Sequence, residues 1–287
     1  MRALVLSGGA SKGAFQKGCL DYILGDLNKQ YDILLGVSVG ALNAAMLAMF
    51  DNNSNQQALE FLSKIWNNVS TKQIYKRWFP FGKLHALWQR SLYDSSPLED
   101  LVNKEFNLEQ AKSTGKQLSV GAVSLTAGTY SMFDMSHPEF NKCVIASASF
   151  PTMFKPVFFD NQWWSDGGVR EATPIKAAIE AGATEIDVIF TSSTKEVKEM
   201  DNNSKTLKVA LRTLELMIEE LMEDDISKAL MYNKLVECGA EPDKRSVKIN
   251  VLRPEGPLTS DVLNFNQDKV QPMIKIGYDT AKKNFKG

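Results

Sequence analysis

An alternation of short apolar runs with glycine-rich turns and helical segments in the first fifty residues constrains the fold most. Residues 2–6 form a short, mostly apolar run that ends in a Ser-Gly-Gly turn, as a buried parallel strand does. The pattern then predicts a helix over 14–27, a strand over 31–35 and a helix over 39–50. Strands that alternate with helices in this way predict an α/β fold with a mainly parallel sheet.

The rest of the chain continues this alternation. Apolar alternation over 118–125 and 129–133, on either side of Ala127-Gly128, predicts a hairpin. Residues 141–147 fit either a short strand or a helix. Further strands are expected at 185–190 and 247–252, and helices from Ser96, over 205–236 and over 266–285. Because the sequence has no repeat and no obvious linker, we expect one domain over 1–287, with residues 51–115 as a cap-like insertion.

Charge and cysteine content exclude several classes of protein. The 33 basic and 34 acidic residues give a net charge of −1, whereas a protein that binds nucleic acid in bulk is usually more basic. Cys19, Cys143 and Cys238 are far apart, which argues against a disulfide framework or a cysteine zinc site. The sequence shows neither an apolar run of about 18 residues nor a cleavable N-terminal signal. We therefore expect a cytoplasmic protein, and we leave export by a signal-independent route open.

A nucleophile motif follows the second expected strand. Gly36-Val37-Ser38-Val39-Gly40 is a G-x-S-x-G sequence between an apolar run and a helical segment, the context that a nucleophile elbow requires. The helix N-terminus would favour negative charge developing near Ser38. A glycine-rich turn with a capping serine is the equally weighted alternative.

A second glycine-rich loop follows the first expected strand. In Gly8-Gly9-Ala10-Ser11-Lys12-Gly13, small residues leave backbone N–H groups exposed at a helix start, which suits binding of an anion. The anion could be a phosphate or the oxyanion of an acyl-transfer intermediate. The spacing matches neither the P-loop nor the G-x-G-x-x-G pattern.

The choice of general base is restricted because the chain has only two histidines. No histidine follows His137, whereas the histidine of α/β-hydrolases comes last in the chain, so we interpret His85 and His137 as surface residues. Asp166, in Asp166-Gly167-Gly168, is the alternative base. Packing against Trp163 and Trp164 would raise its pKa toward a useful value. An Asp-Gly turn between strands is the competing interpretation.

Together these features resemble the patatin-like phospholipase family. That family carries a glycine-rich oxyanion loop, a G-x-S-x-G elbow, an A-S-x-x-x-P motif and a D-G-G or D-G-A motif, and all four occur here in order. The third is Ala146-Ser147-Ala148-Ser149-Phe150-Pro151. The resemblance spans the chain and is weakest over 51–115. One departure is Ala172-Thr173-Pro174, where the family often has N-x-P; the missing Asn would loosen the loop that holds Asp166.

The resemblance implies a three-layer α/β/α fold and a lipid acyl hydrolase of the phospholipase A or lysophospholipase type. Ser38 would attack a fatty-acyl ester, and Asp166 would take its proton and later activate water, without histidine. Backbone N–H groups at Gly8, Gly9, Ala10 and Val39 would form the oxyanion hole. Lys12 and Gly13 are expected to contact substrate, although Lys12 could instead cap the loop. No cofactor is expected. The alternatives are an acyltransferase on the same serine and a non-catalytic membrane- or nucleotide-binding module.

Two charged segments remain. Residues 61–93 hold six basic and no acidic residues together with eight aromatics, which suits a cap that contacts membrane surfaces peripherally. The alternative is a solvated helical pair whose aromatics pack on the core. The acidic residues between 215 and 225 are interpreted as the solvated face of the long helix. Because they lack the spacing of a calcium loop, we expect no metal site there.

Overall fold

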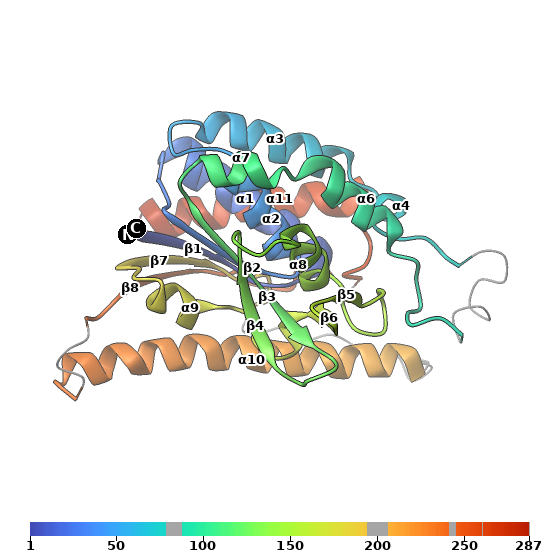
Figure 1. Ribbon diagram of the computed structural model, residues 1–287. Helices are drawn as coiled ribbons and strands as arrows, with labels where there is room; N and C mark the ends of the chain where they lie inside the picture. The colour runs from blue at the N-terminus through green and yellow to red at the C-terminus, as the bar shows by residue number, and fades with distance from the viewer. Residues whose placement is uncertain (79–87, 194–205, 241–244, 260, 287) are drawn as a thin grey trace.

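A central sheet with helices on both faces organises the computed structural model (Figure 1). The structure describes residues 1–78, 88–193, 206–240, 245–259 and 261–286. In these ranges eight strands form one sheet in the order β5-β6-β3-β2-β1-β7-β8, with β4 also paired to β3. The strands are β1 (Arg2–Leu6), β2 (Ile33–Val37), β3 (Gln117–Ser124), β4 (Tyr130–Asp134), β5 (Val157–Phe159), β6 (Gln162–Asp166), β7 (Glu185–Ile189) and β8 (Lys248–Leu252).

The sheet is mainly parallel, as the sequence predicts. Strands β8, β7, β1, β2 and β3 pair in parallel, whereas β4, β6 and β5 join through antiparallel pairing. Strands β3 and β4 are the hairpin expected around Ala127-Gly128. In an open parallel sheet, ligands bind beyond the carboxyl ends of the strands. Ser38 follows the carboxyl end of β2, so the nucleophile motif lies at that edge.

Helices cover both faces and create two hydrophobic cores, which confirms the three-layer α/β/α arrangement. Leu4 and Leu6 of β1 face one core, and Ala3 and Val5 face the other, because successive side chains of a strand alternate. The first core contains α1 (Gly13–Leu20), η2 (Asp21–Asp26), α2 (Val39–Ala48), α3 (Asn55–Asn68), α4 (Thr71–Ile74), α6 (Ser96–Glu105), α7 (Leu108–Ser113), α8 (Phe140–Ser147) and α11 (Gln267–Lys286). Helices α9 (Ile175–Glu180) and α10 (Thr206–Glu237) line the opposite face (Figure 1).

Local details differ from the sequence patterns at two places. Residues 141–147, for which the sequence allows either a strand or a helix, are helical in α8. The helix expected over 14–27 changes from α-helical to π-helical hydrogen bonding where η2 begins at Asp21. At both places the apolar side chains are buried in the observed conformation, so the hydrophobic pattern alone does not distinguish a strand from a helix at 141–147, or α-helical from π-helical hydrogen bonding after Asp21.

The basic, aromatic segment 61–93 is partly built into the core. Trp66 is buried on α3 and donates its indole N–H to Asn43 Oδ1 at 3.0 Å. Trp78 donates to the Ser91 carbonyl at 3.0 Å, whereas Trp88 is 79% exposed. His85 lies in 79–87, outside the described residues. That 51–115 form a cap, and that 61–93 contact a membrane, stay predictions.

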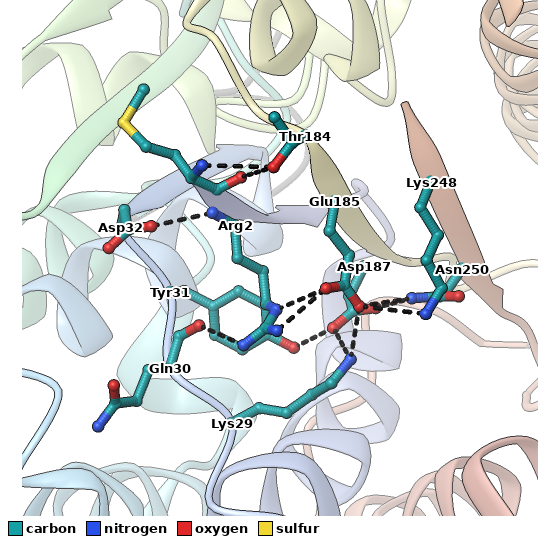
Figure 2. A network of polar contacts seen from close by, with 11 residues as sticks. Arg2, Lys29, Gln30, Tyr31, Asp32, Thr184, Glu185, Asp187, Lys248 and Asn250 are labelled. Carbon is teal, nitrogen blue, oxygen red and sulfur yellow. Dashed lines mark hydrogen bonds and ion pairs between the residues drawn. The ribbon is translucent and has the colours of Figure 1, made fainter. Parts of the chain in front are cut away.

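A buried polar network stabilises the sheet at the end away from Ser38 (Figure 2). Asp187 of β7 is fully buried and accepts hydrogen bonds from the Tyr31 hydroxyl at 2.5 Å, Lys29 Nζ at 2.7 Å and Asn250 Nδ2 at 2.6 Å. Arg2 and Lys29 also pair with Glu185 on the same strand. A buried carboxylate with three donors satisfies the requirement that interior charges be paired.

Candidate active site

Ser38 occupies a strained turn between β2 and α2. Its backbone has φ 59° and ψ −130°, an unusual conformation for a residue with a side chain. A Cβ at Gly36 would lie 2.3 Å from the Gly40 carbonyl oxygen, and one at Gly40 would lie 2.1 Å from the Leu6 carbonyl oxygen. Both flanking positions therefore require glycine. This is the strand-turn-helix geometry of a nucleophile elbow, which presents the serine hydroxyl at a helix start.

Sheet register brings Asp166 to the same place. Strand β4 pairs with residues 119–123 along one edge of β3. Strands β2 and β6 each pair with residues of β3 that overlap this span, so both must lie along the opposite edge of β3. On that edge β2 ends at the pair Val37–Gly121, and β6 ends at the adjacent pair Asp166–Ala122. Ser38 and Asp166 are therefore brought together although 128 positions separate them.

The A-S-x-x-x-P motif positions both residues, a role that sequence analysis missed. The Ser38 N–H donates to Ser147 Oγ at 3.0 Å. The Asp166 N–H donates to the Ser149 carbonyl at 3.0 Å, and the Ser165 hydroxyl donates to the same oxygen. The motif thus connects the two candidate catalytic residues through one short segment at the end of α8. Its serines were visible in the sequence, but their partners are too distant along the chain to be recognised there.

Asp166 has the environment of a poised base. Its side chain is 2% exposed, and burial raises its pKa to about 7 because the charged form loses hydration. The Ser38 hydroxyl and the Gly168 N–H, which donates to Oδ1 at 2.8 Å, lower the pKa in part. Oδ2 has no hydrogen-bond partner of standard geometry among the described residues.

The two tryptophans before Asp166 pack against neighbouring aromatic rings. Trp164 stacks on Phe159 at 5.4 Å, and Trp163 packs against Phe158. Neither lines the cavity that contains Ser38 and Asp166. Burial is the largest cause of the raised pKa of Asp166, and the expected share of the tryptophans in that burial stays a prediction.

The glycine-rich loop lies directly beside the elbow. A Cβ at Gly8 would approach Ser38 Cβ to 3.2 Å. Gly9 has φ 152°, and a Cβ there would lie 2.1 Å from Thr191 Oγ1. Gly8 donates its N–H to the Ala172 carbonyl at 3.3 Å, so this N–H holds the loop and is poorly suited to an oxyanion. The N–H groups of Gly9 and Ala10 take no part in the backbone hydrogen bonds that hold the loop among the described residues.

Lys12 and Gly13 differ in their relation to the site. Lys12 is 6% exposed and lines the cavity, and its N–H donates to the Gly9 carbonyl at 3.0 Å. Gly13 does not line the cavity. A Cβ there would lie 2.3 Å from Val39 Cγ2 and 3.0 Å from the Trp66 ring. Gly13 therefore permits helix packing beneath the loop, and its expected contact with substrate stays a prediction.

A cavity of about 610 Å³ connects these groups. Ser38, Asp166, Gly8, Gly9, Ala10, Lys12 and Val39 line it together with many apolar side chains. The apolar lining comprises Leu42, Ile74, Leu98, Phe150, Met153, Phe154, Leu211, Ile218, Met222, Val262, Leu263 and Phe265. A volume of this size lies in the range of ligand pockets, and the apolar wall suits a hydrocarbon chain.

Helix α10 contributes charged residues to the same cavity. Arg212, Glu215 and Glu219 line it, although the acidic residues of this helix were interpreted as a solvated face. Asp225, farther along α10, accepts the Thr173 N–H at 3.0 Å, and burial raises its pKa to about 6. This contact holds the loop after Asp166, where the sequence has Thr173 and the family often has N-x-P. The loop is therefore anchored by α10 in a way that the departure from the motif did not indicate.

His137 lies away from the cavity. Its Nδ1 accepts the Glu139 N–H at 3.1 Å, and its Nε2 contacts Asp160 Oδ2 at 2.8 Å. The Cys143 thiol is 3.4 Å from Nδ1, but burial raises its pKa to about 12, so this group is a packed thiol and not a nucleophile. Among the described residues no histidine lines the cavity.

Comparisons with known proteins show the family to which the chain belongs. The model of the patatin-like phospholipase family matches residues 4–179, which is more than half of the chain. A probable lipid hydrolase, 463L, of Invertebrate iridescent virus 6 is 22% identical over 87% of this chain and 91% of its own length. The uncharacterized protein YjjU of Escherichia coli is 26% identical over 66% of this chain, which spans about half of that relative.

A solved structure, VipD from Legionella pneumophila, aligns over 99% of this chain and 66% of its own, with 14% identity and a TM-score of 0.47. None of the helices in the described ranges has the length and apolar character needed to cross a bilayer. Both candidate catalytic residues, Ser38 and Asp166, fall within the matched residues 4–179. On the strength of that match, the chain belongs to the patatin-like phospholipase family of lipid hydrolases.

Proposed function

We propose that the chain is a serine esterase that hydrolyses fatty-acyl esters of phospholipids or lysophospholipids. One observation carries the proposal: Ser38, on a strained elbow, and Asp166, a buried carboxyl with a pKa of about 7, line the same largely apolar cavity. Membership of a lipid hydrolase family supports a lipid substrate. The name of the viral relative, a probable lipid hydrolase, points the same way.

Acylation follows from this arrangement. Ser38 Oγ attacks the ester carbonyl carbon while Asp166 takes the hydroxyl proton, and the carbonyl electrons move onto the oxygen. The N–H groups of Gly9, Ala10 and Val39 are the candidates to stabilise this oxyanion, because they lie beside the elbow or at the start of α2. The tetrahedral intermediate then collapses, and the leaving alcohol receives the proton from Asp166.

Deacylation repeats these steps with water. Asp166 removes a proton from a water molecule that attacks the acyl-Ser38 ester, and Ser38 recovers the proton as the fatty acid leaves. A base with a pKa near 7 suits both half-reactions, because it is deprotonated in part at neutral pH and still accepts a proton strongly. The apolar side chains of the cavity would hold the hydrocarbon chain during both steps.

Contact with a membrane surface is part of this proposal, because the substrate resides there. Trp88 is the most exposed aromatic side chain of segment 61–93 in the described residues. Indole rings favour the interface between water and lipid, and the basic residues nearby favour anionic headgroups. We expect Trp88→Ala to weaken binding to vesicles without changing hydrolysis of a monomeric ester.

Lipid hydrolysis and covalent labelling test the proposed function together. Wild type should release fatty acid from lysophospholipid and should gain one fluorophosphonate adduct by intact mass. Ser38→Ala should do neither, whereas Ser63→Ala, which removes a hydroxyl on α3 outside the cavity, should do both. Labelling of Ser38→Ala to the same extent as wild type would refute Ser38 as the nucleophile. Added acceptor alcohols would reveal acyl transfer as a competing product.

A further inference from the structure

Helix α10 places a charged cluster inside the apolar cavity. Arg212, Glu215 and Glu219 lie three and four positions apart on one face, and all three line the cavity that contains Ser38. Arg212 Nη1 contacts Glu215 Oε2 at 3.2 Å and Glu219 Oε1 at 3.3 Å. The Arg212 side chain is 13% exposed. The cluster carries one positive and two negative charges.

Helix α10 carries both apolar and charged side chains on its exposed surface. Leu216, Met217, Leu230 and Met231 are exposed there together with Asp224 and Lys228, while Arg212, Glu215 and Glu219 face the cavity. The Arg212, Glu215 and Glu219 side chains are 13%, 23% and 21% exposed, so the cluster is partly buried, and an ion pair in such a place contributes little to stability. Recognition of a charged ligand gives this arrangement a function that stability alone does not.

Helix α10 is linked to the glycine-rich loop through Met222, which lies about one helical turn from Glu219, the nearest residue of the cluster. Met222 Sδ accepts the Ser192 hydroxyl at 3.2 Å, and the adjacent Thr191 hydroxyl donates to the Gly8 carbonyl. At a rise of about 1.5 Å per residue, Glu219 lies about 5 Å and Arg212 about 15 Å along α10 from Met222. Because Ser38 and the cluster line one cavity, we place the headgroup of a lipid whose ester is at Ser38 toward this part of the helix.

We propose that Arg212, Glu215 and Glu219 select a zwitterionic headgroup, a phosphate linked to an ammonium group. This inference rests on the proposed function, since it assigns the headgroup of the same lipid substrate. On binding, the phosphate replaces a carboxylate at Arg212, and the released carboxylate pairs with the ammonium group. The zwitterion brings one positive and one negative charge, so the exchange leaves the net charge of the cluster unchanged, and guanidinium suits phosphate geometrically.

The exchange predicts an order of affinity among headgroups. Phosphocholine and phosphoethanolamine lipids should bind best, because each supplies both partners. A phosphoglycerol lipid would engage Arg212 but leave a displaced carboxylate without a cation. A lipid with only hydroxyl groups would offer neither charge. Loss of one partner of a buried charge pair corresponds to at least about 30-fold in affinity.

Binding of non-hydrolysable lipids tests the proposal independently of catalysis. Single-chain ether lipids with phosphocholine, phosphoglycerol or glycerol headgroups are titrated calorimetrically below their micellar concentrations. Arg212→Gln should weaken phosphocholine binding at least about 30-fold and leave the glycerol lipid within about threefold. Glu215→Gln combined with Glu219→Gln should reduce the preference for phosphocholine over phosphoglycerol. Lys228→Gln and Asp224→Asn, which remove exposed charges from the same helix, are the matched controls.

The outcomes separate this inference from the proposed function. Equal affinities of wild type for the three lipids, or unchanged selectivity in both cluster variants, would overturn the headgroup assignment even if Ser38 labels normally. If Arg212→Gln does not fold, the double variant Glu215→Gln and Glu219→Gln tests the headgroup assignment alone, because this variant retains the Arg212 guanidinium. Selective binding without Ser38 labelling would support the headgroup site and refute the proposed chemistry.

Discussion

Replacing Asp166 with asparagine should stabilise the folded protein while it removes activity. Burial raises the pKa of this carboxyl from 3.8 to about 7, so ionising it is harder in the folded state than in the unfolded chain. A shift of about three units corresponds to about 4 kcal/mol. Asparagine keeps an oxygen that can accept the Gly168 N–H but carries no charge to desolvate.

The difference in the free energy of unfolding between Asp166→Asn and wild type should depend on pH. Below about pH 3 the carboxyl is largely protonated in both states, and wild type carries almost no penalty. Between the unfolded pKa of 3.8 and the folded pKa of about 7 the unfolded chain ionises before the folded protein does, so the free energy of unfolding falls over this range. The stability gain of Asp166→Asn should therefore be near zero at about pH 3 and approach about 4 kcal/mol at pH 8.

Urea unfolding followed by tryptophan fluorescence at several pH values measures this difference. Asp224→Asn is the matched control, because its carboxyl is exposed on α10 and should show little change. Activity of wild type should rise with pH and level off above about 7, as deprotonated Asp166 accumulates. An Asp166→Asn variant that is no more stable than wild type at pH 8 would refute the claim that this carboxylate is held at a desolvation cost.

Three further predictions concern residues around the site and the sheet. Alanine at both His85 and His137 should change kcat/KM by less than about threefold in an esterase assay, whereas loss of a general base costs about 10²–10⁴-fold. Ser147→Ala removes the acceptor of the nucleophile's N–H and should lower kcat roughly 10-fold or more, with little change in circular dichroism. Tyr31→Phe removes a donor to Asp187 and should cost about 1–3 kcal/mol in urea unfolding while kcat is unchanged.

Sequence patterns predicted those parts of the fold that depend on neighbouring residues. The strand-turn-helix at Ser38 follows from an apolar run, two required glycines and a helix-forming segment, all within about fifteen positions. The β3–β4 hairpin is encoded equally locally by alternation around Gly128. Both were predicted, because local steric and hydrophobic preferences decide them.

Contacts between distant segments could not be predicted from these patterns. The hydrogen bond from Ser38 to Ser147 joins residues 109 positions apart, and the packing of α8 against β3 and α2 brings their segments together. Glu215 and Glu219 were misassigned to the solvated face of α10, whereas Asp224 is exposed as expected. The helix has apolar residues on both faces, so periodicity does not show which face is buried. Arg212 was consequently missed as a cavity residue.

The rate at which a fluorophosphonate labels Ser38, measured against pH, tests the Ser38–Asp166 dyad most directly. We predict that the wild-type rate follows one ionisation with a midpoint near 7, the pKa of Asp166. Asp166→Asn should label at least about 100-fold more slowly and without this pH dependence. Labelling of Asp166→Asn at the wild-type rate, with the same midpoint, would contradict the assignment of Asp166 as the base.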